Sequence, residues 1–234
     1  MIVRFAWLFV LAALACVVTA VQIDREALRK PQMAAAVPDG LASFAAQQSA
    51  AAAVMRGDGA QALDRARRLV RKRPLPAEHL TLLAQAEALA GNETAALRAM
   101  EAAAGRGWRE PFAQNAMAAA ALNSGDKDIA AQRLSALWAI GFARERLGNL
   151  TRAMLATADG RAAFAQRLVA PGRWHSNFVT GAIELVPPEH LSDTIVRARE
   201  GGANLDCSAL KTLALGLEGR ARPALAARVS AGCA

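Results

Sequence analysis

Three histidines, His79, His175 and His190, are the side chains in this 234-residue sequence best suited to acid–base or metal chemistry. None stands at the spacing of a metal site or a catalytic pair, and the motifs HExxH, CxxC, GxSxG and GxxxxGK[ST] do not occur. Glu189 precedes His190 but follows two prolines, which favours a role in starting a helix. The sequence therefore predicts no catalytic residue, metal, cofactor or small-molecule substrate. The remote alternative is an envelope enzyme that processes glycans with carboxylates from distant positions.

Two cysteines near the C-terminus, Cys207 and Cys233, bracket the last two predicted helices, over 209–217 and 223–229. In an antiparallel helix hairpin the start of the first helix lies beside the end of the second, so these thiols are expected to approach bonding distance. The sequence predicts a disulfide between them, with two unrelated thiols as the alternative. Because disulfides persist outside the reducing cytoplasm, the pair favours export.

The N-terminal segment, residues 1–23, contains an uncharged apolar run from Phe5 to Val21 that follows Arg4. The run is close to the shortest that spans a hydrocarbon core of about 30 Å at about 1.5 Å per residue. We expect a signal anchor, with a signal peptide cleaved near residues 18–20 as the alternative.

Both alternatives carry the rest of the chain out of the cytoplasm. We expect an inner-membrane anchor with a periplasmic domain, or secretion to the periplasm after cleavage. Lipidation at Cys16 is a weaker third possibility, since Ala13 stands where such signals usually have leucine. The basic residues that follow the segment leave its orientation open. Residues 24–42, rich in proline and alanine toward their end, are expected to form a linker.

The composition favours an all-α protein. The chain is alanine-rich and 54% hydrophobic, and its β-branched residues are scattered rather than clustered. A net charge of +8 permits contact with anionic partners. No aromatic platform or known motif accompanies these charges, so nucleic acid is not an expected partner.

A repeat organises residues 43–144. Three glycines stand 34 residues apart, each followed by alanine five residues later, and an apolar helix is expected on either side of each glycine. The three pairs are Gly57 and Ala62, Gly91 and Ala96, and Gly125 and Ala130. Glycine followed by Asp or Asn suits the turn, because glycine adopts positive φ and the next side chain caps a helix. The alanines are expected to allow close helix packing.

This segment resembles a tetratricopeptide repeat (TPR) array. The 34-residue period, the turn glycines, the alanines and Pro74 at the end of the first repeat carry the resemblance. The sequence departs from the family at Ala46, Leu80 and Gln114, which occupy its aromatic positions. The resemblance implies an antiparallel helix-pair solenoid, here with an N-terminal hydrophobic helix and a divergent helical cap over 145–234.

The resemblance also implies a concave groove, lined by the first helix of each pair, that binds a peptide. Carried over by spacing, this candidate peptide groove consists of Phe44, Gln47, Glu78, Thr81, Gln85, Phe112, Asn115 and Asn123. Ordinary solvated side chains on surface helices are the alternative.

A basic cluster covers the second helix of the first repeat: Arg65, Arg67, Arg68, Arg71, Lys72 and Arg73. It is expected to face anionic lipid, with a solvated helix face as the alternative.

The C-terminal region is expected to continue as helices of less regular spacing. A pair over 147–155 and 162–169 is predicted to turn at Asp159 and Gly160. Pro188 and Pro223 suit the first turns of later helices. Together these features predict a membrane-tethered or exported TPR-like adaptor that binds a protein or peptide partner at a bacterial cell envelope. A structural or oligomerisation spacer in an envelope assembly is the alternative.

Overall fold

The protein is all-helical, as its composition predicts. The computed structural model describes residues 2–141 and 144–233, and no β-strand occurs among them. The chain divides into two compact units, Met1–Arg106 and Gly107–Ala234. This division falls inside the predicted repeat region, between the second and the third repeat.

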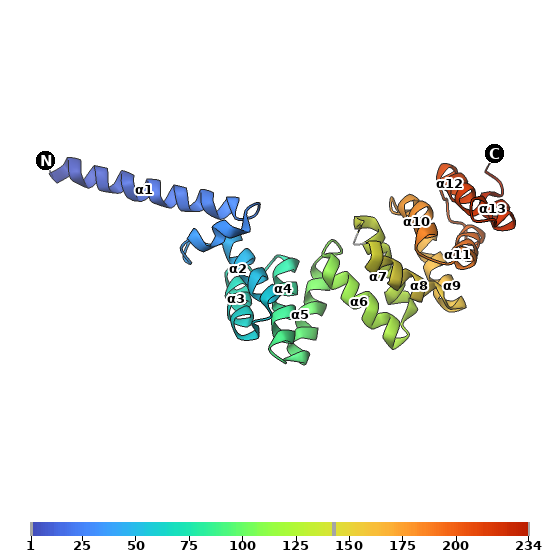
Figure 1. Cartoon of the computed structure of the whole chain (residues 1–234), viewed down its shortest axis with the longest axis horizontal. Helices are drawn as coiled ribbons and strands as arrows, with labels where there is room; N and C mark the ends of the chain where they lie inside the picture. Colours follow the sequence, from blue (N-terminus) through green and yellow to red (C-terminus); the bar gives the residue numbers. More distant parts are fainter. Residues whose placement is uncertain (1, 142–143, 234) are drawn as a thin grey trace. The chain divides into compact units, whose positions relative to one another are not determined.

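The first unit contains a long N-terminal helix, a short 3₁₀-helix and four further α-helices (Figure 1). Their bounds are α1 Ile2–Glu26, η1 Pro31–Ala36, α2 Phe44–Arg56, α3 Gly59–Lys72, α4 Ala77–Leu89 and α5 Glu93–Arg106. Helices α2, α3 and α4 each pack on the next helix along the chain, and α2 also contacts α4.

The turn glycines adopt the left-handed backbone conformation that their sequence context predicts. Gly57, Gly91 and Gly125 have φ values of 73°, 79° and 82°, where a Cβ atom is unfavourable. Asp58 and Asp126 then accept backbone N–H groups in the first turns of the helices that follow. The turns at Gly57 and Gly125 therefore each end one helix and cap the next.

Small residues form the contacts among α2, α3 and α4. Ala53, Ala62, Ala66 and Ala86 are each 0% exposed and form one cluster, so the helix backbones approach closely. Of the repeat alanines, Ala62 and Ala130 are buried, whereas Ala96 is half-buried.

Asp24, in the last turn of α1, ties that helix to the start of α2. Its carboxylate is 5% exposed and accepts the backbone N–H groups of Ser43 (2.9 Å), Phe44 (3.2 Å) and Ala45 (2.8 Å). Groups at this position lack partners within their own helix and lie at the positive end of the helix dipole. Ser43, the N-cap residue, makes no side-chain cap bond, so Asp24 performs this role from 19 residues earlier.

The segment 24–42 packs as part of the first unit. Ala27, Val37 and Ala42 are buried together with Ala45 of α2, and Ile23 of α1 packs against them. The expected linker therefore contributes a small apolar core that fastens the end of α1.

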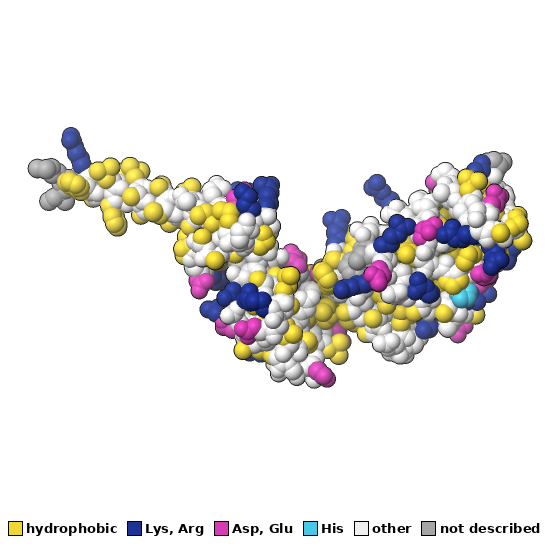
Figure 2. Space-filling view, in the orientation of Figure 1, with side chains coloured by type: hydrophobic (Ala, Val, Ile, Leu, Met, Phe, Trp, Pro, Cys, Tyr) yellow, Lys and Arg dark blue, Asp and Glu magenta, His cyan; other side chains and the backbone are white. Residues whose placement is uncertain are grey.

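The rest of α1 leaves its apolar side chains uncovered, as Figure 2 shows (yellow). Phe5, Trp7 and Phe9 are 68%, 64% and 75% exposed. Among the described residues, α1 is the one helix long and apolar enough to cross a membrane. By length and composition it suits a membrane anchor or a signal sequence.

The second unit is built around a larger core. Its elements are α6 Pro111–Ser124, α7 Lys127–Ile140, α8 Arg144–Leu155, α9 Ala158–Val169, α10 His175–Gly181, η2 Ala182–Glu184, α11 Pro188–Glu200, α12 Cys207–Glu218 and α13 Pro223–Ser230. Phe164 and Phe178 are fully buried at its centre. Trp138 packs edge-on against Phe178 at 5.3 Å between ring centroids, and its indole N–H donates to Thr151 Oγ1 at 3.2 Å.

The predicted turn at Asp159 and Gly160 is wrong by two to three residues. Thr157 caps α9 by accepting the backbone N–H of Gly160, so both predicted turn residues lie in the first turn of the helix. A Cβ atom on Gly160 would lie 1.9 Å from the carbonyl oxygen of Met154. Glycine is required here for close backbone approach rather than for a turn. Pro188 and Pro223 do occupy first-turn positions, as expected.

Candidate functional site

Two residues of the candidate peptide groove, Phe44 and Gln47, contact side chains outside α2: Phe44 contacts Arg73 at the end of α3, and Gln47 contacts His79 of α4. The guanidinium of Arg73 lies over the Phe44 ring at 5.1 Å and donates to Ser43 Oγ at 3.0 Å. Gln47 Oε1 lies 3.4 Å from Nε2 of His79. Both side chains are half-buried and already bridge neighbouring helices.

The other candidate groove residues of the first unit lie on α4. Thr81 is 3% exposed, and its hydroxyl donates to the carbonyl of Ala77 at 3.4 Å. Glu78 is exposed and Gln85 is half-buried. Of these three, Glu78 and Gln85 therefore present polar groups to solvent.

The candidate groove residues of the second unit follow one side of α6. Asn115 and Asn123 follow Phe112 by three and eleven residues, which places all three on the same helix face. Phe112 is 47% exposed, Asn123 is exposed and Asn115 is half-buried. Just before α6, Trp108 is 50% exposed with the guanidinium of Arg109 4.9 Å from its ring centroid. This part of the second unit presents aromatic and amide groups together.

The six residues of the basic cluster point in different directions. Arg67 pairs with the buried Glu87 of α4 at 3.0 Å, and Arg73 packs on Phe44. Arg71 is exposed. The remaining three, Arg65, Arg68 and Lys72, recur every three or four residues along α3 and line a groove.

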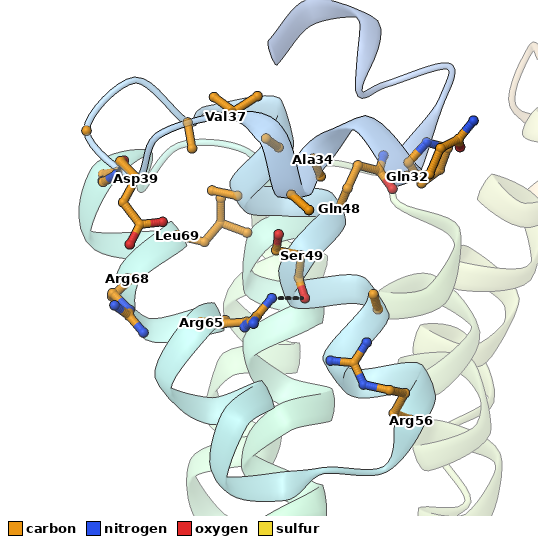
Figure 3. A pocket seen from close by; sticks show the side chains of 18 residues that line it. Gln32, Ala34, Val37, Asp39, Gln48, Ser49, Arg56, Arg65, Arg68 and Leu69 are labelled. Atoms are coloured by element: carbon orange, nitrogen blue, oxygen red, sulfur yellow. Dashed lines mark hydrogen bonds between the residues drawn. The ribbon is translucent and has the colours of Figure 1, made fainter. Parts of the chain in front are cut away.

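This groove, here called the η1–α3 groove, lies between η1, α2 and α3 within the first unit (Figure 3). Its volume is about 730 Å³, within the usual range for ligand sites. Val37 and Leu69 form part of an apolar floor, together with alanines of η1 and α2. Arg56 joins the groove from the end of α2, and Figure 3 shows Arg56 and Arg65 on adjacent helices.

Local bonds hold the cations of the η1–α3 groove without removing their charge. Arg65 donates to the carbonyl of Ser49 at 3.5 Å, the dashed line in Figure 3. Arg56 donates to the side chain of Gln61 at 2.6 Å, and Lys72 donates to the carbonyl oxygen of Asp39.

The charge balance of the η1–α3 groove is positive. Four cations line it against one carboxylate, that of Asp39. Arg68 pairs with Asp64 on the exposed surface of α3. The groove therefore suits an anionic group joined to an apolar body.

The basic-cluster prediction identified three of the four cations but missed Arg56 and η1. Arg56 stands directly before the turn glycine Gly57, which is the sequence signal that places it at a helix end. Nothing in the sequence pattern indicates that residues 31–40 pack on α2 and reach Lys72 of α3, because that path depends on the packing of Val37 and Ala42.

Two of the three histidines are buried, and the third, His190, is half-buried. His79 and His175 are 1% and 7% exposed, and burial holds the pKa of each below its ordinary value. His79 Nδ1 lies 2.9 Å from the carbonyl of Arg73. Within residues 2–141 and 144–233, no cluster of three or more His, Cys, Asp or Glu residues forms a metal site.

The predicted disulfide is present in the second unit. Cys207, the first residue of α12, is bonded to Cys233, just after α13, with 5.5 Å between their Cα atoms. Helices α12 and α13 pack on each other as a hairpin, which is the arrangement that brings the two thiols together.

No protein-family model matches this chain, and comparison with curated proteins gives no match.

Proposed function

We propose that this chain is a membrane-tethered, TPR-like adaptor that binds a protein or peptide partner at a bacterial cell envelope. The observation that carries the proposal is the set of hydrogen bonds made by Asp24. They join an apolar, uncovered helix to a packed helical unit through three backbone N–H groups. If α1 is inserted in a membrane, these bonds keep the packed helices of the first unit at the membrane surface.

The TPR-like character of the scaffold is supported by its repeat geometry. The turn glycines have positive φ, and the helices on either side of each glycine pack on one another. The 34-residue period matches the TPR family, although leucine, alanine and glutamine replace its aromatic residues.

A protein or peptide partner is supported by the exposed face of α6. An aromatic ring and amide groups on one helix face suit a peptide, since the ring offers apolar contact and the amides pair with backbone groups. Phe112, Asn115 and Asn123 are the residues that we propose contact the partner.

A periplasmic location is supported by the disulfide between Cys207 and Cys233. The preferred form of the protein keeps α1 in the inner membrane, and the alternative form is secreted to the periplasm after cleavage. Intact-mass measurement of the chain from washed membranes separates them. Retention of residues 1–20 supports the tether, and a chain that begins near residue 21 in the soluble fraction contradicts it.

Partner binding is tested by photocrosslinking in intact cells. A photoreactive amino acid is placed at Phe112 or Asn123 of the full chain, and at the exposed Gln166 of α9 as a matched control. The proposal expects a protein captured from the α6 positions and not from the control. Capture of only a second copy of this chain favours the spacer alternative, and equal capture from all three positions argues against a docking face on α6.

A further inference from the structure

The η1–α3 groove lies next to the end of α1. Helix α1 has 25 residues, or about 37 Å at about 1.5 Å per residue, against a hydrocarbon core of about 30 Å. After the apolar run, Gln22 and Ile23 are also uncharged and Asp24 is the first charged residue, so the last turn of an inserted α1 reaches the headgroup layer. Helix η1, one wall of the groove, begins at Pro31 and contacts α1.

The groove combines the two properties that an amphiphilic anion requires. Arg56, Arg65, Arg68 and Lys72 supply positive charge, and Val37 with neighbouring alanines supplies apolar surface. Arginine pairs with phosphate through two parallel N–H bonds, and lysine acts as a compact charge.

The groove's surroundings match a membrane surface. Leu28 and Leu41, on either side of η1, are 47% and 38% exposed. Exposed leucine beside clustered cations is typical of segments that lie at the boundary between headgroups and acyl chains.

We propose that the η1–α3 groove binds the headgroups of anionic phospholipids in the membrane that α1 enters. The inference rests on the tethering part of the proposed function and is independent of the α6 face. Charge complementarity alone also fits an acidic peptide. Lipid is favoured because an inserted α1 holds the groove at headgroup depth, where anionic headgroups surround it.

The experiment uses the full chain in nanodiscs that contain no other protein. The discs contain phosphatidylcholine with a minor share of phosphatidylglycerol whose headgroup carries a diazirine. After illumination, labelled peptides are mapped by mass spectrometry. The groove variant is R56Q/R68Q, which removes one exposed cation from each of two walls. The matched control is R71Q/R98Q, which removes two exposed cations of the same unit that lie outside the groove.

In the unchanged chain we expect labelling within residues 31–72. In R56Q/R68Q the yield of this labelling should be lower by a factor of between five and about 25. A cation near an anionic surface strengthens binding about fivefold, so two removals approach the upper figure. R71Q/R98Q is expected to label within twofold of the unchanged chain. Far-UV circular dichroism of all three chains checks that the helices are retained.

Three results would overturn the proposal. Equal labelling of the groove variant and the control variant shows that the groove has no special role. Equal labelling by a diazirine on phosphatidylcholine shows that anionic charge is not recognised. The third result has two parts: a soluble poly-glutamate peptide abolishes the lipid labelling, and the peptide binds equally well to the chain in discs of phosphatidylcholine alone. This result assigns the groove to an acidic peptide. Retention of the chain in phosphatidylcholine discs reports the tether separately, so failure of the tether and failure of lipid recognition are distinguished.

Discussion

Removing the Asp24 carboxylate should open the junction between α1 and α2 without unfolding the second unit. Asp24 accepts three backbone N–H bonds at the start of α2 and is almost completely buried. Loss of an N-cap costs about 0.5–2 kcal/mol, and hydrogen bonds to a charged group are stronger than the average. For Asp24→Ala we therefore expect about 2–3 kcal/mol of local destabilisation.

Asp24→Asn should have a smaller effect, because the two oxygens have different partners. Oδ1 accepts from Ser43 and Ala45, and Oδ2 accepts from Phe44. An asparagine that keeps the first oxygen presents its amide N–H₂ to the Phe44 donor, losing one bond and the attraction to the helix dipole. About 1 kcal/mol is expected.

The assay is hydrogen exchange with mass spectrometry on the full chain in nanodiscs. A cost of about 2 kcal/mol corresponds to about 30-fold faster exchange of the first-turn amides of α2. Glu26→Gln is the matched control, since Glu26 is a half-buried residue of α1 whose carboxylate pairs only with Arg29, at 3.6 Å, among the described side chains. Its exchange should stay within twofold of the unchanged chain. If Asp24→Ala also stays within twofold, the Asp24 cap does not stabilise the junction.

The remaining predictions concern the stability of the second unit. Its unfolding is followed by the fluorescence of its tryptophans. The double variant C207S/C233S should lower its free energy of unfolding by about 3.5 kcal/mol, as the chain-entropy account gives for residues 26 apart. Gly160→Ala should destabilise by more than about 2 kcal/mol, because its Cβ would lie 1.9 Å from a backbone carbonyl oxygen. Gly216→Ala, inside α12 with ordinary contact to its neighbours, should stabilise by about 0.5–1 kcal/mol. Acidification from neutral pH should weaken the unit, because burial holds the pKa of His175 below its ordinary value of about 6.5 and the unfolded chain binds the proton first. Above pH about 6.5 the stability that the neutral His175 contributes is fully present. This stability is lost as the pH falls toward the lower pKa of His175 in the folded protein.

Each of these predictions has its own control. Reducing agent should destabilise the unchanged chain as much as the double cysteine variant and leave that variant unaffected. Equal stability of the two glycine variants would contradict the close approach at Gly160. His175→Gln should flatten the decline in stability between neutral pH and about pH 5, and an unaltered decline would assign it to other groups.

The all-α fold and the local form of the repeat follow from the sequence by itself. The glycines at a 34-residue period have positive φ. Glycine adopts this conformation readily because it lacks the Cβ atom that disfavours it in other residues, whatever the tertiary surroundings. Pro188 and Pro223 begin helices for a similarly local reason, the absence of an N–H group to satisfy. The disulfide was also predictable, because a short hairpin leaves few ways to arrange its two ends.

The η1–α3 groove, the Asp24 cap and the function of Gly160 were decided only by the tertiary structure. Asp24 meets its donors from 19 to 21 residues away, and no spacing rule links a carboxylate in one helix to the start of another. The same holds for the basic cluster. Helical periodicity separates Arg67 from Arg68, but only the path of residues 31–40 decides that Arg65, Arg68 and Lys72 line a groove. Local sterics and hydrogen bonding act over a few residues and can be read from the sequence. The groove depends on which segments pack together, and the burial of Ala27, Val37 and Ala42 against α2 determines that packing.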